Sequence, residues 1–199
     1  YFPRFGVPTN LPEHGRNIEA GLAYKDGATE ATAVYYRNRL KDLLVSTTIC
    51  PVEPASYPFG CAYNVNRATL TGLSLGVRTR VGPLDLSGAL DLQDPQDDTT
   101  GKQLVRRAKR HANLAAEYSS GALVVGAALH LSGKRFDDTA NRNTLGGYGL
   151  LNLFGSYRLA PDWSAIVRWN NATGKKYELA RTYETAGSQL FIGVRYGAR

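Results

Sequence analysis

The chain has 199 residues, and its apolar share of 43% would allow a packed core. Its net charge of +7 comes from lysines and arginines on the polar faces of alternating segments or between them, with neither a basic tail nor a groove-reading helix, which argues against nucleic-acid binding. No stretch approaches the ~18 apolar residues of a membrane-spanning helix. Because Met is absent and no leader opens the chain at Tyr1, we expect a piece of a larger protein.

The first third of the chain predicts a loop followed by a hairpin. Residues 1–15 contain three prolines and little alternation. Residues 17–24 then place Ile18, Ala20 and Leu22 on one face, which is the period of a β-strand. Asp26-Gly27 predicts a tight turn, and residues 29–48 predict the returning strand.

Cys50 and Cys61 are the only cysteines and flank a proline-rich loop. Two cysteines with no nearby histidine cannot complete a tetrahedral metal site. A disulfide suits a chain exported through an oxidising compartment, and a free pair is the alternative.

Residues 67–93 predict a second hairpin, with a turn at Gly82-Pro83. Its second strand alternates four leucines with polar residues and is the cleanest amphipathic strand of the chain. Residues 94–103 then predict an acidic, turn-rich loop.

Residues 104–132 predict a third hairpin, which turns at Ser119-Ser120-Gly121. Every second residue from Arg107 to Glu117 is polar except Ala115, and every second residue from Leu123 to Leu131 is apolar. Each segment exceeds the ~5 to 6 residues of an average globular strand and matches the ~9 to 11 that a tilted strand needs to cross a bilayer. The segment therefore predicts a transmembrane hairpin.

The last third predicts a polar loop over residues 134–147, a hairpin over 148–171 and a final strand over 189–196. Trp163 and Trp169 would be about 20 Å apart at ~3.3 Å per residue, close to the height of the apolar band between aromatic girdles. We expect the amphipathic rings of Tyr118, Trp163, Trp169 and Tyr196 to form such girdles.

Tight turns alternate with long loops along the whole chain, which is typical of outer-membrane proteins with the turns in the periplasm. The fold class predicted is all-β: an antiparallel transmembrane β-barrel segment of about nine strands in a meander. Bacterial barrels close with even strand numbers, so further strands are expected from sequence outside this chain. A soluble antiparallel β domain is the alternative and would require polar outer faces. The expected strands are residues 17–24, 29–48, 67–81, 84–93, 104–118, 123–132, 148–159, 163–171 and 189–196.

Six motifs resemble the C-terminal half of the barrel of TonB-dependent outer-membrane receptors and, within that family, most resemble the cobalamin receptors. These motifs are Asn10–Glu13, Arg16–Leu22, Gly82–Leu84, Leu104–Lys109, Tyr177-Glu178 and Tyr183–Gly187. The resemblance implies a 22-stranded barrel closed by an N-terminal plug, of which residues 1–199 would be the last nine strands, without the plug and the first strands.

The resemblance also implies a function without bond chemistry. It implies a receptor in the outer membrane of a Gram-negative bacterium that takes up cobalamin, or a ferric siderophore, through TonB acting on the missing plug. Outer-membrane lipid and lipopolysaccharide would surround it, and no cofactor is implied.

Arg106 stands where the cobalamin receptors have a ligand-contacting arginine, so the resemblance implies that its guanidinium contacts ligand. The alternative is a rim arginine that pairs with lipopolysaccharide or with the acidic loop Asp94–Asp98. By strand alternation Arg107, Lys109 and His111 face the lumen, where we expect them to pair with carboxylates of the plug.

Two further kinds of site, a calcium site and a catalytic site, have weaker support in the sequence. Asp91, Asp94, Asp97 and Asp98 could hold calcium, but their spacing fits no EF-hand and also suits a solvated loop, so no metal site is predicted. An outer-membrane barrel enzyme would need a nucleophile near His111 or His130, and Ser132 is the only nearby hydroxyl. We therefore expect no enzyme.

Overall fold

The computed structural model describes residues 5–197, with the side chains of residues 65 and 66 excluded. The first four residues of the expected loop 1–15 lie outside this range. Within it, no helix has the length and apolar character needed to span a membrane.

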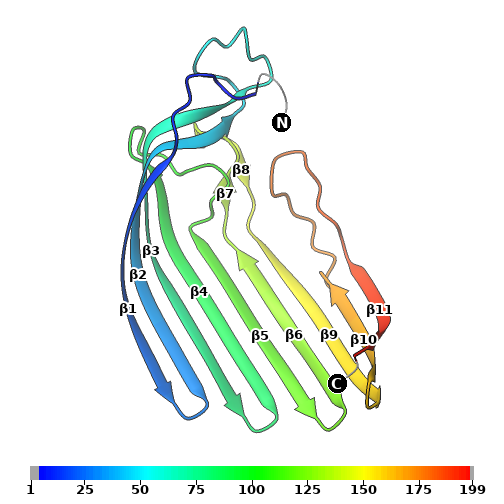
Figure 1. The fold of residues 1–199 in the computed structure, drawn as a ribbon. Helices are drawn as coiled ribbons and strands as arrows, with labels where there is room; N and C mark the ends of the chain where they lie inside the picture. Colours follow the sequence, from blue (N-terminus) through cyan, green and yellow to red (C-terminus); the bar gives the residue numbers. More distant parts are fainter. Residues whose placement is uncertain (1–4, 198–199) are drawn as a thin grey trace.

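Nine long strands form one antiparallel sheet in which each strand pairs with the next strand along the chain, apart from a short two-stranded insertion (Figure 1). The predicted all-β meander is thereby confirmed. The strands of the large sheet are β1 (His14–Asp26), β2 (Thr29–Thr47), β3 (Cys61–Val81), β4 (Leu84–Asp97), β5 (Arg110–Ser120), β6 (Leu123–Ser132), β9 (Tyr148–Ala160), β10 (Trp163–Asn170) and β11 (Gln189–Tyr196). The insertion pairs β7 (Arg135–Phe136) with β8 (Thr144–Leu145).

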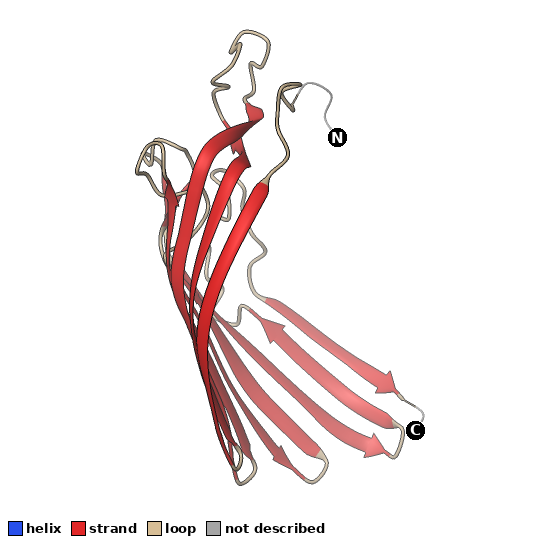
Figure 2. Ribbon diagram, turned by 60° about the vertical axis from the view of Figure 1, so that its left-hand side comes forward, coloured by secondary structure: helices blue, strands red, loops and turns tan. Residues whose placement is uncertain are grey.

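The sheet is a single curved layer, and neither of its faces is covered by a second sheet in the described part of the chain (Figure 2). Because side chains alternate along a pleated strand, the register assigns whole rows to one face. Leu75 lies opposite Leu90, which lies opposite Ala112, and this row belongs to the apolar outer face. Leu22 and Ile192 on the same face are each 80% exposed. Such rows face lipid in a barrel wall and contradict the polar outer face that a soluble domain would need.

The two ends of the sheet differ, as the connection lengths predict. Tight turns occupy one end, where Gly27, Gly82 and Gly121 have positive φ angles of 51°, 58° and 58° that glycine adopts without strain (Figure 1). Long loops occupy the other end. These are called the turn end and the loop end below.

Buried apolar residues gather at the loop end rather than in a central core. Leu104 packs with Leu43, Ala68 and Leu70, so the loop between β4 and β5 is held against β2 and β3. A second small cluster joins Val7 to the two cysteines. The first cluster thus anchors the loop that contains Leu104, and the second anchors the loop between the two cysteines.

The strand expected from residue 104 begins only at Arg110. Arg106 adopts a left-handed φ of 57°, which breaks the extended conformation. Ala108 is fully buried, and its carbonyl accepts a 2.7 Å hydrogen bond from the side chain of Gln93. The polar alternation before Arg110 therefore belongs to a folded loop that sequence periodicity does not distinguish from a strand.

Candidate functional site

Three loops meet at the loop end and form the candidate site. They are residues 98–109, 133–147 and 171–188. Asn141, itself left-handed with φ of 56°, joins the first two: its side-chain oxygen accepts the N–H of Gln103 and its side-chain amide donates to the Gln103 carbonyl, both at 2.9 Å. Arg181 in the third loop donates to the Asn143 side chain at 2.8 Å. The three loops thus form one connected surface.

Arg106 is fixed by both its backbone and its side chain. Its N–H donates to the carbonyl of Phe136 at 2.7 Å, and its Nε donates to Asp137 Oδ1 at 2.7 Å. The Asp137 side chain is only 10% exposed, whereas that of Arg106 is 48% exposed. The partner is therefore Asp137 and not the acidic loop Asp94–Asp98 that the sequence offered as an alternative. Because only Nε is engaged among the described residues, the two terminal nitrogens of the guanidinium remain available to an acceptor.

Asp138, next to that ion pair, organises the tip of its loop. Its carboxylate accepts the N–H of Asn143 at 2.5 Å and that of Arg142 at 3.2 Å. Burial alone would raise the pKa of Asp138, but the backbone N–H groups of Asn143, Arg142 and Ala140 outweigh burial and lower the pKa below its ordinary value. The ionised carboxylate is thus part of the loop structure.

Arg135 holds the third loop in place. It is 3% exposed, its guanidinium lies 5.2 Å from the centre of the Tyr148 ring, and its Nη2 donates to the carbonyl of Glu178. Tyr148 and Tyr177 have ring centres 4.3 Å apart, and His130 lies 5.9 Å from Tyr148. This group of aromatic rings was missed by sequence reasoning, because its members come from three separate segments and only Tyr177 lies in a recognised motif.

The three basic residues expected in the lumen are divided by the structure. Arg107 and Lys109 precede β5, but the Gln93 N–H donates to the Lys109 carbonyl at 2.8 Å, so the ladder between β4 and β5 continues to Lys109. Lys109 pairs with Asp94 at 2.5 Å, and Asp94 lies on the same face of β4 as Leu92. His111 is opposite Asp91 and Ser132, on the inner face. The register therefore places His111 on the inner face, and the lumenal position of Arg107 and Lys109 stays a prediction.

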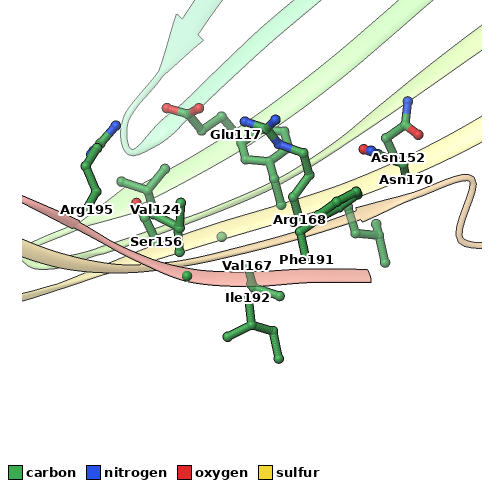
Figure 3. Close-up of a pocket in the computed structure, with 15 residues that line it drawn as sticks. Glu117, Val124, Asn152, Ser156, Val167, Arg168, Asn170, Phe191, Ile192 and Arg195 are labelled. Atoms are coloured by element: carbon green, nitrogen blue, oxygen red, sulfur yellow. The ribbon is translucent and has the colours of Figure 1, made fainter. Parts of the chain in front are cut away.

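A concave hollow of about 610 Å³ lies over the inner face of β9, β10 and β11. Figure 3 shows Arg168 and Arg195 directed to one side of these strands and Val167 and Ile192 to the other. Glu117 and Asn152 also line the hollow. The inner face therefore carries charged and polar side chains beside Val124, Phe154, Ile166 and Phe191, whereas the outer face is aliphatic.

The four aspartates considered for calcium do not converge. Asp91 accepts the Ser74 hydroxyl at 2.5 Å and Asp94 pairs with Lys109. Asp97 accepts the Thr99 N–H and Asp98 accepts the Thr69 hydroxyl, each at 2.8 Å. Across residues 5–197, no three His, Cys, Asp or Glu side chains form a group that could hold a metal ion.

The histidines form no catalytic arrangement in the described residues. His130 Nδ1 lies 2.7 Å from the side-chain oxygen of Asn113, and Ser132 is buried. No hydrogen bond joins Ser132 to either His111 or His130 in this part of the chain, so the geometry of an activated serine is not present.

The remaining expected residues lie at the ends of the strands. Cys50 and Cys61 form a disulfide whose two residues are buried. Trp163 and Tyr196 are cross-strand partners near the turn end, with ring centres 4.9 Å apart, and Trp169 lies six residues nearer the loop end. Tyr118 is opposite Leu84, also near the turn end. All four girdle candidates are exposed, as rings at two membrane interfaces would be.

The architecture defines a class of protein: a single antiparallel sheet with an aliphatic outer face, a polar inner face, tight turns at one end and long loops at the other is the wall of a transmembrane β-barrel. The chain matches the family described as TonB dependent receptor-like, beta-barrel, over residues 1–172, and it belongs to that family. Barrels of this family lie in the outer membrane of Gram-negative bacteria, which is the localisation of this chain.

Two curated relatives are named vitamin B12 transporter BtuB. One, from Photobacterium profundum, is 26% identical over 198 residues, which are 98% of this chain and 32% of that protein. The other, from Vibrio vulnificus, is 24% identical over 196 residues, which are 97% of this chain and 30% of that protein. The chain therefore spans about a third of the length of the curated relatives it matches.

Solved structures share the fold. The copper transporter OprC superposes with a TM-score of 0.79 at 18% identity, covering 95% of this chain and 31% of that one. The FrpB iron transporter from Neisseria meningitidis (F3-3 variant) superposes with a TM-score of 0.71 at 20% identity, covering 96% and 32%. These relatives and neighbours are named as transporters of different cargoes: vitamin B12, copper and iron.

Proposed function

We propose that residues 1–199 are the C-terminal portion of the barrel of a receptor that imports cobalamin, with the plug and the first strands supplied by the rest of the protein. The support is that both curated relatives carry the name of a vitamin B12 transporter and align with nearly the whole chain. In this proposal the protein binds and moves its cargo without breaking bonds in it, and TonB acts through the plug.

The observation that carries the proposal is the half-exposed guanidinium of Arg106 on the connected loop surface. Its ion pair with Asp137 fixes the side chain while leaving both terminal nitrogens available, and such a fork matches phosphate or carboxylate oxygens. Cobalamin carries a phosphodiester and amide oxygens that this fork can bind. We propose Arg106 as a ligand contact.

The inner face supports a plug in the same barrel. The charged side chains of Glu117, Arg168 and Arg195 point into the concave side and would be left without partners if an apolar body filled the lumen. A plug with carboxylates and backbone carbonyls facing β9 to β11 provides them with partners. His111 on the inner face is proposed to contact the same domain.

A ferric siderophore is the second candidate cargo. The fold neighbours include the FrpB iron transporter and FpvA in complex with a heterologous pyoverdine and iron, with TM-scores of 0.71 each. A guanidinium fork binds the carboxylates of an anionic chelate as well as it binds a phosphate. Binding measurements distinguish the two cargoes.

The test uses the full-length receptor in detergent, titrated with cyanocobalamin and separately with ferric siderophores. We expect cobalamin to bind more tightly than about 1 μM, which corresponds to roughly 8 kcal/mol. We expect Arg106→Gln to weaken binding about tenfold or more, because a charge-assisted hydrogen bond is lost. Arg158→Gln, which removes an exposed guanidinium at the turn end of β9, is the control and should bind as the wild type does.

Each part of the proposal has its own contrary result. If cobalamin binds with a Kd of about 1 μM or weaker and a ferric siderophore binds tightly, the siderophore is the cargo. If the Arg106→Gln variant and the wild type bind cobalamin equally well, Arg106 is not a ligand contact, but cobalamin is still the cargo.

A further inference from the structure

Five basic side chains lie together on the outer face of β1, β2 and β3, towards the loop end. They are Arg16 on β1, Arg37, Arg39 and Lys41 on β2, and Arg67 on β3, and all five are exposed. The register places Arg16 opposite Arg39 and Lys41 opposite Arg67. This group is called the outer basic patch.

The position of the patch follows from strand alternation. Tyr35 lies opposite Leu73, which lies opposite Leu92, so Tyr35 belongs to the aliphatic outer face. Arg37 and Arg39 follow on the same side of β2, two and four residues beyond Tyr35, or about 7 and 13 Å along the strand. The patch therefore begins where the apolar band ends on the extracellular side, at the depth of the lipid headgroups.

The charges of the patch are not balanced by ion pairs in the described part of the chain. None of its members belongs to an ion pair with a carboxylate in residues 5–197. Two acidic side chains of β4 and its loop lie near the patch. Asp94 pairs with Lys109, and Asp98 accepts the hydroxyl of Thr69, the residue opposite Arg39. Both neighbours of β2 are described strands, so no further strand can insert beside it.

Like charges directly opposite each other in a sheet destabilise it. Two such pairs lie in adjacent rows, and the single negative charge of Asp98 does not balance the five basic side chains, so an anion from outside the protein would relieve their repulsion. The outer face limits the source of that anion, because the same strands contact lipid immediately below the patch. A molecule anchored in the outer leaflet presents its headgroup at this height.

We propose that the outer basic patch binds the phosphate groups of a lipid of the outer leaflet. The arginine forks of Arg37 and Arg39 donate paired hydrogen bonds to phosphate oxygens, and Lys41 adds a compact charge. Bound lipid would neutralise the two opposed pairs and tie β1, β2 and β3 together at the membrane surface. The inference rests on the placement of the sheet in the membrane and is independent of the cargo.

The experiment uses the full-length receptor purified in mild detergent, and native mass spectrometry counts retained lipid after incubation with bisphosphorylated lipid A or with its dephosphorylated form. The test variant is Arg37→Gln/Arg39→Gln/Lys41→Gln. The control, Lys134→Gln/Lys175→Gln/Lys176→Gln, removes the same charge from lysines in loops away from the outer face of β1 to β3. Altered gel migration on heating verifies that each barrel is folded.

We expect the wild type and the control to retain the phosphorylated lipid and to bind the dephosphorylated form at least tenfold less. We expect the test variant to lose phosphorylated lipid by on the order of tenfold or more, since each basic residue contributes separately at an anionic membrane surface. Should the triple variant not fold, Arg39→Gln alone should still lower retention severalfold.

Three outcomes overturn the proposal. The first is equal retention of both lipid forms, and the second is equal retention by the test variant and the control. The third is that the patch holds a co-purified acidic protein, or inorganic phosphate alone, in place of lipid.

Discussion

Gly126 illustrates how single residues shape the inner wall. A Cβ atom at this position would lie 2.3 Å from the Phe154 ring and 2.8 Å from the Ala116 carbonyl oxygen. Because Gly126 on β6 has no side chain, the ring of Phe154 on the neighbouring strand β9 can lie over it. The backbone oxygen cannot move away without breaking the pairing of β5 and β6, so this close approach leaves no room for a side chain.

We predict that Gly126→Val destabilises the barrel by about 1 to 3 kcal/mol, as overpacking does in well-packed interiors. The measurement is the fraction of full-length receptor that keeps heat-modifiable migration on a gel, followed across a temperature series. Gly146→Val is the control, because a Cβ there meets nothing within 4 Å. Equal thermal stability of the two variants would contradict the packing argument.

Single residues also show where sequence reasoning stops. Alternation correctly assigns Leu75 and Leu90 to one face, because the pleat fixes side-chain direction wherever a strand is continuous. It cannot pair Arg106 with Asp137, since the two residues lie 31 positions apart in different loops and meet only after both loops fold. The family resemblance indicated Arg106, but the partner that fixes its side chain came from the structure.

At the scale of elements, the long strands were predictable and the loop structures were not. The insertion of β7 and β8 has two residues in each strand, too few to show any period. β4 continues to Asp97 through the buried Pro95, whereas an acidic, turn-rich loop was predicted over residues 94–103. β3 begins at Cys61 rather than Arg67, because its pairing with β2 extends to the disulfide. In each case contacts between distant segments override the local pattern.

The loop of residues 133–147 should depend on pH through Asp138. Its pKa is lowered in the folded loop, so the charged form stabilises the loop at any pH above the ordinary aspartate pKa of about 3.9. This stabilisation is lost as the pH falls below that value and through the lowered folded pKa. We predict that the amides of Arg142 and Asn143 remain protected from hydrogen exchange at pH 7 and pH 5 and lose protection below about pH 4.

The comparison for this prediction is Asp138→Asn, which removes the charge and should weaken protection already at pH 7. Asp162→Asn, in a tight turn at the other end of the sheet, should leave the exchange of these amides unchanged. Protection in Asp138→Asn that follows the wild-type pH profile would show that the carboxylate does not hold the loop.

For the molecule as a whole, the two edges of the sheet determine whether the barrel wall is stable in a membrane. β1 and β11 each pair with only one neighbour within the described sheet, so their outer backbone groups are free. In hydrocarbon, each unsatisfied backbone group costs several kcal/mol. The wall therefore requires further strands that pair with β1 and β11, as closure with an even number of strands also does.

We predict that residues 1–199 expressed alone yield aggregated or intermolecularly paired sheet in detergent, because the two edges pair with other copies. The measurement is size-exclusion chromatography with light scattering, together with gel migration before and after heating. Co-refolding with the remaining two thirds of the receptor should restore a heat-modifiable monomer. A stable monomer formed by the 199-residue chain alone would refute the need for outside strands.

The covalent link between Cys50 and Cys61 carries a consequence for the order of events in biogenesis. Bacterial thiols are oxidised in the periplasm, yet this bond lies in the hairpin beyond β2 and β3, which ends up outside the cell. Both sulfurs are shielded beside Val7 once the hairpin has folded. We therefore expect oxidation to precede insertion, so that the loop between Cys50 and Cys61 crosses the membrane as a closed ring.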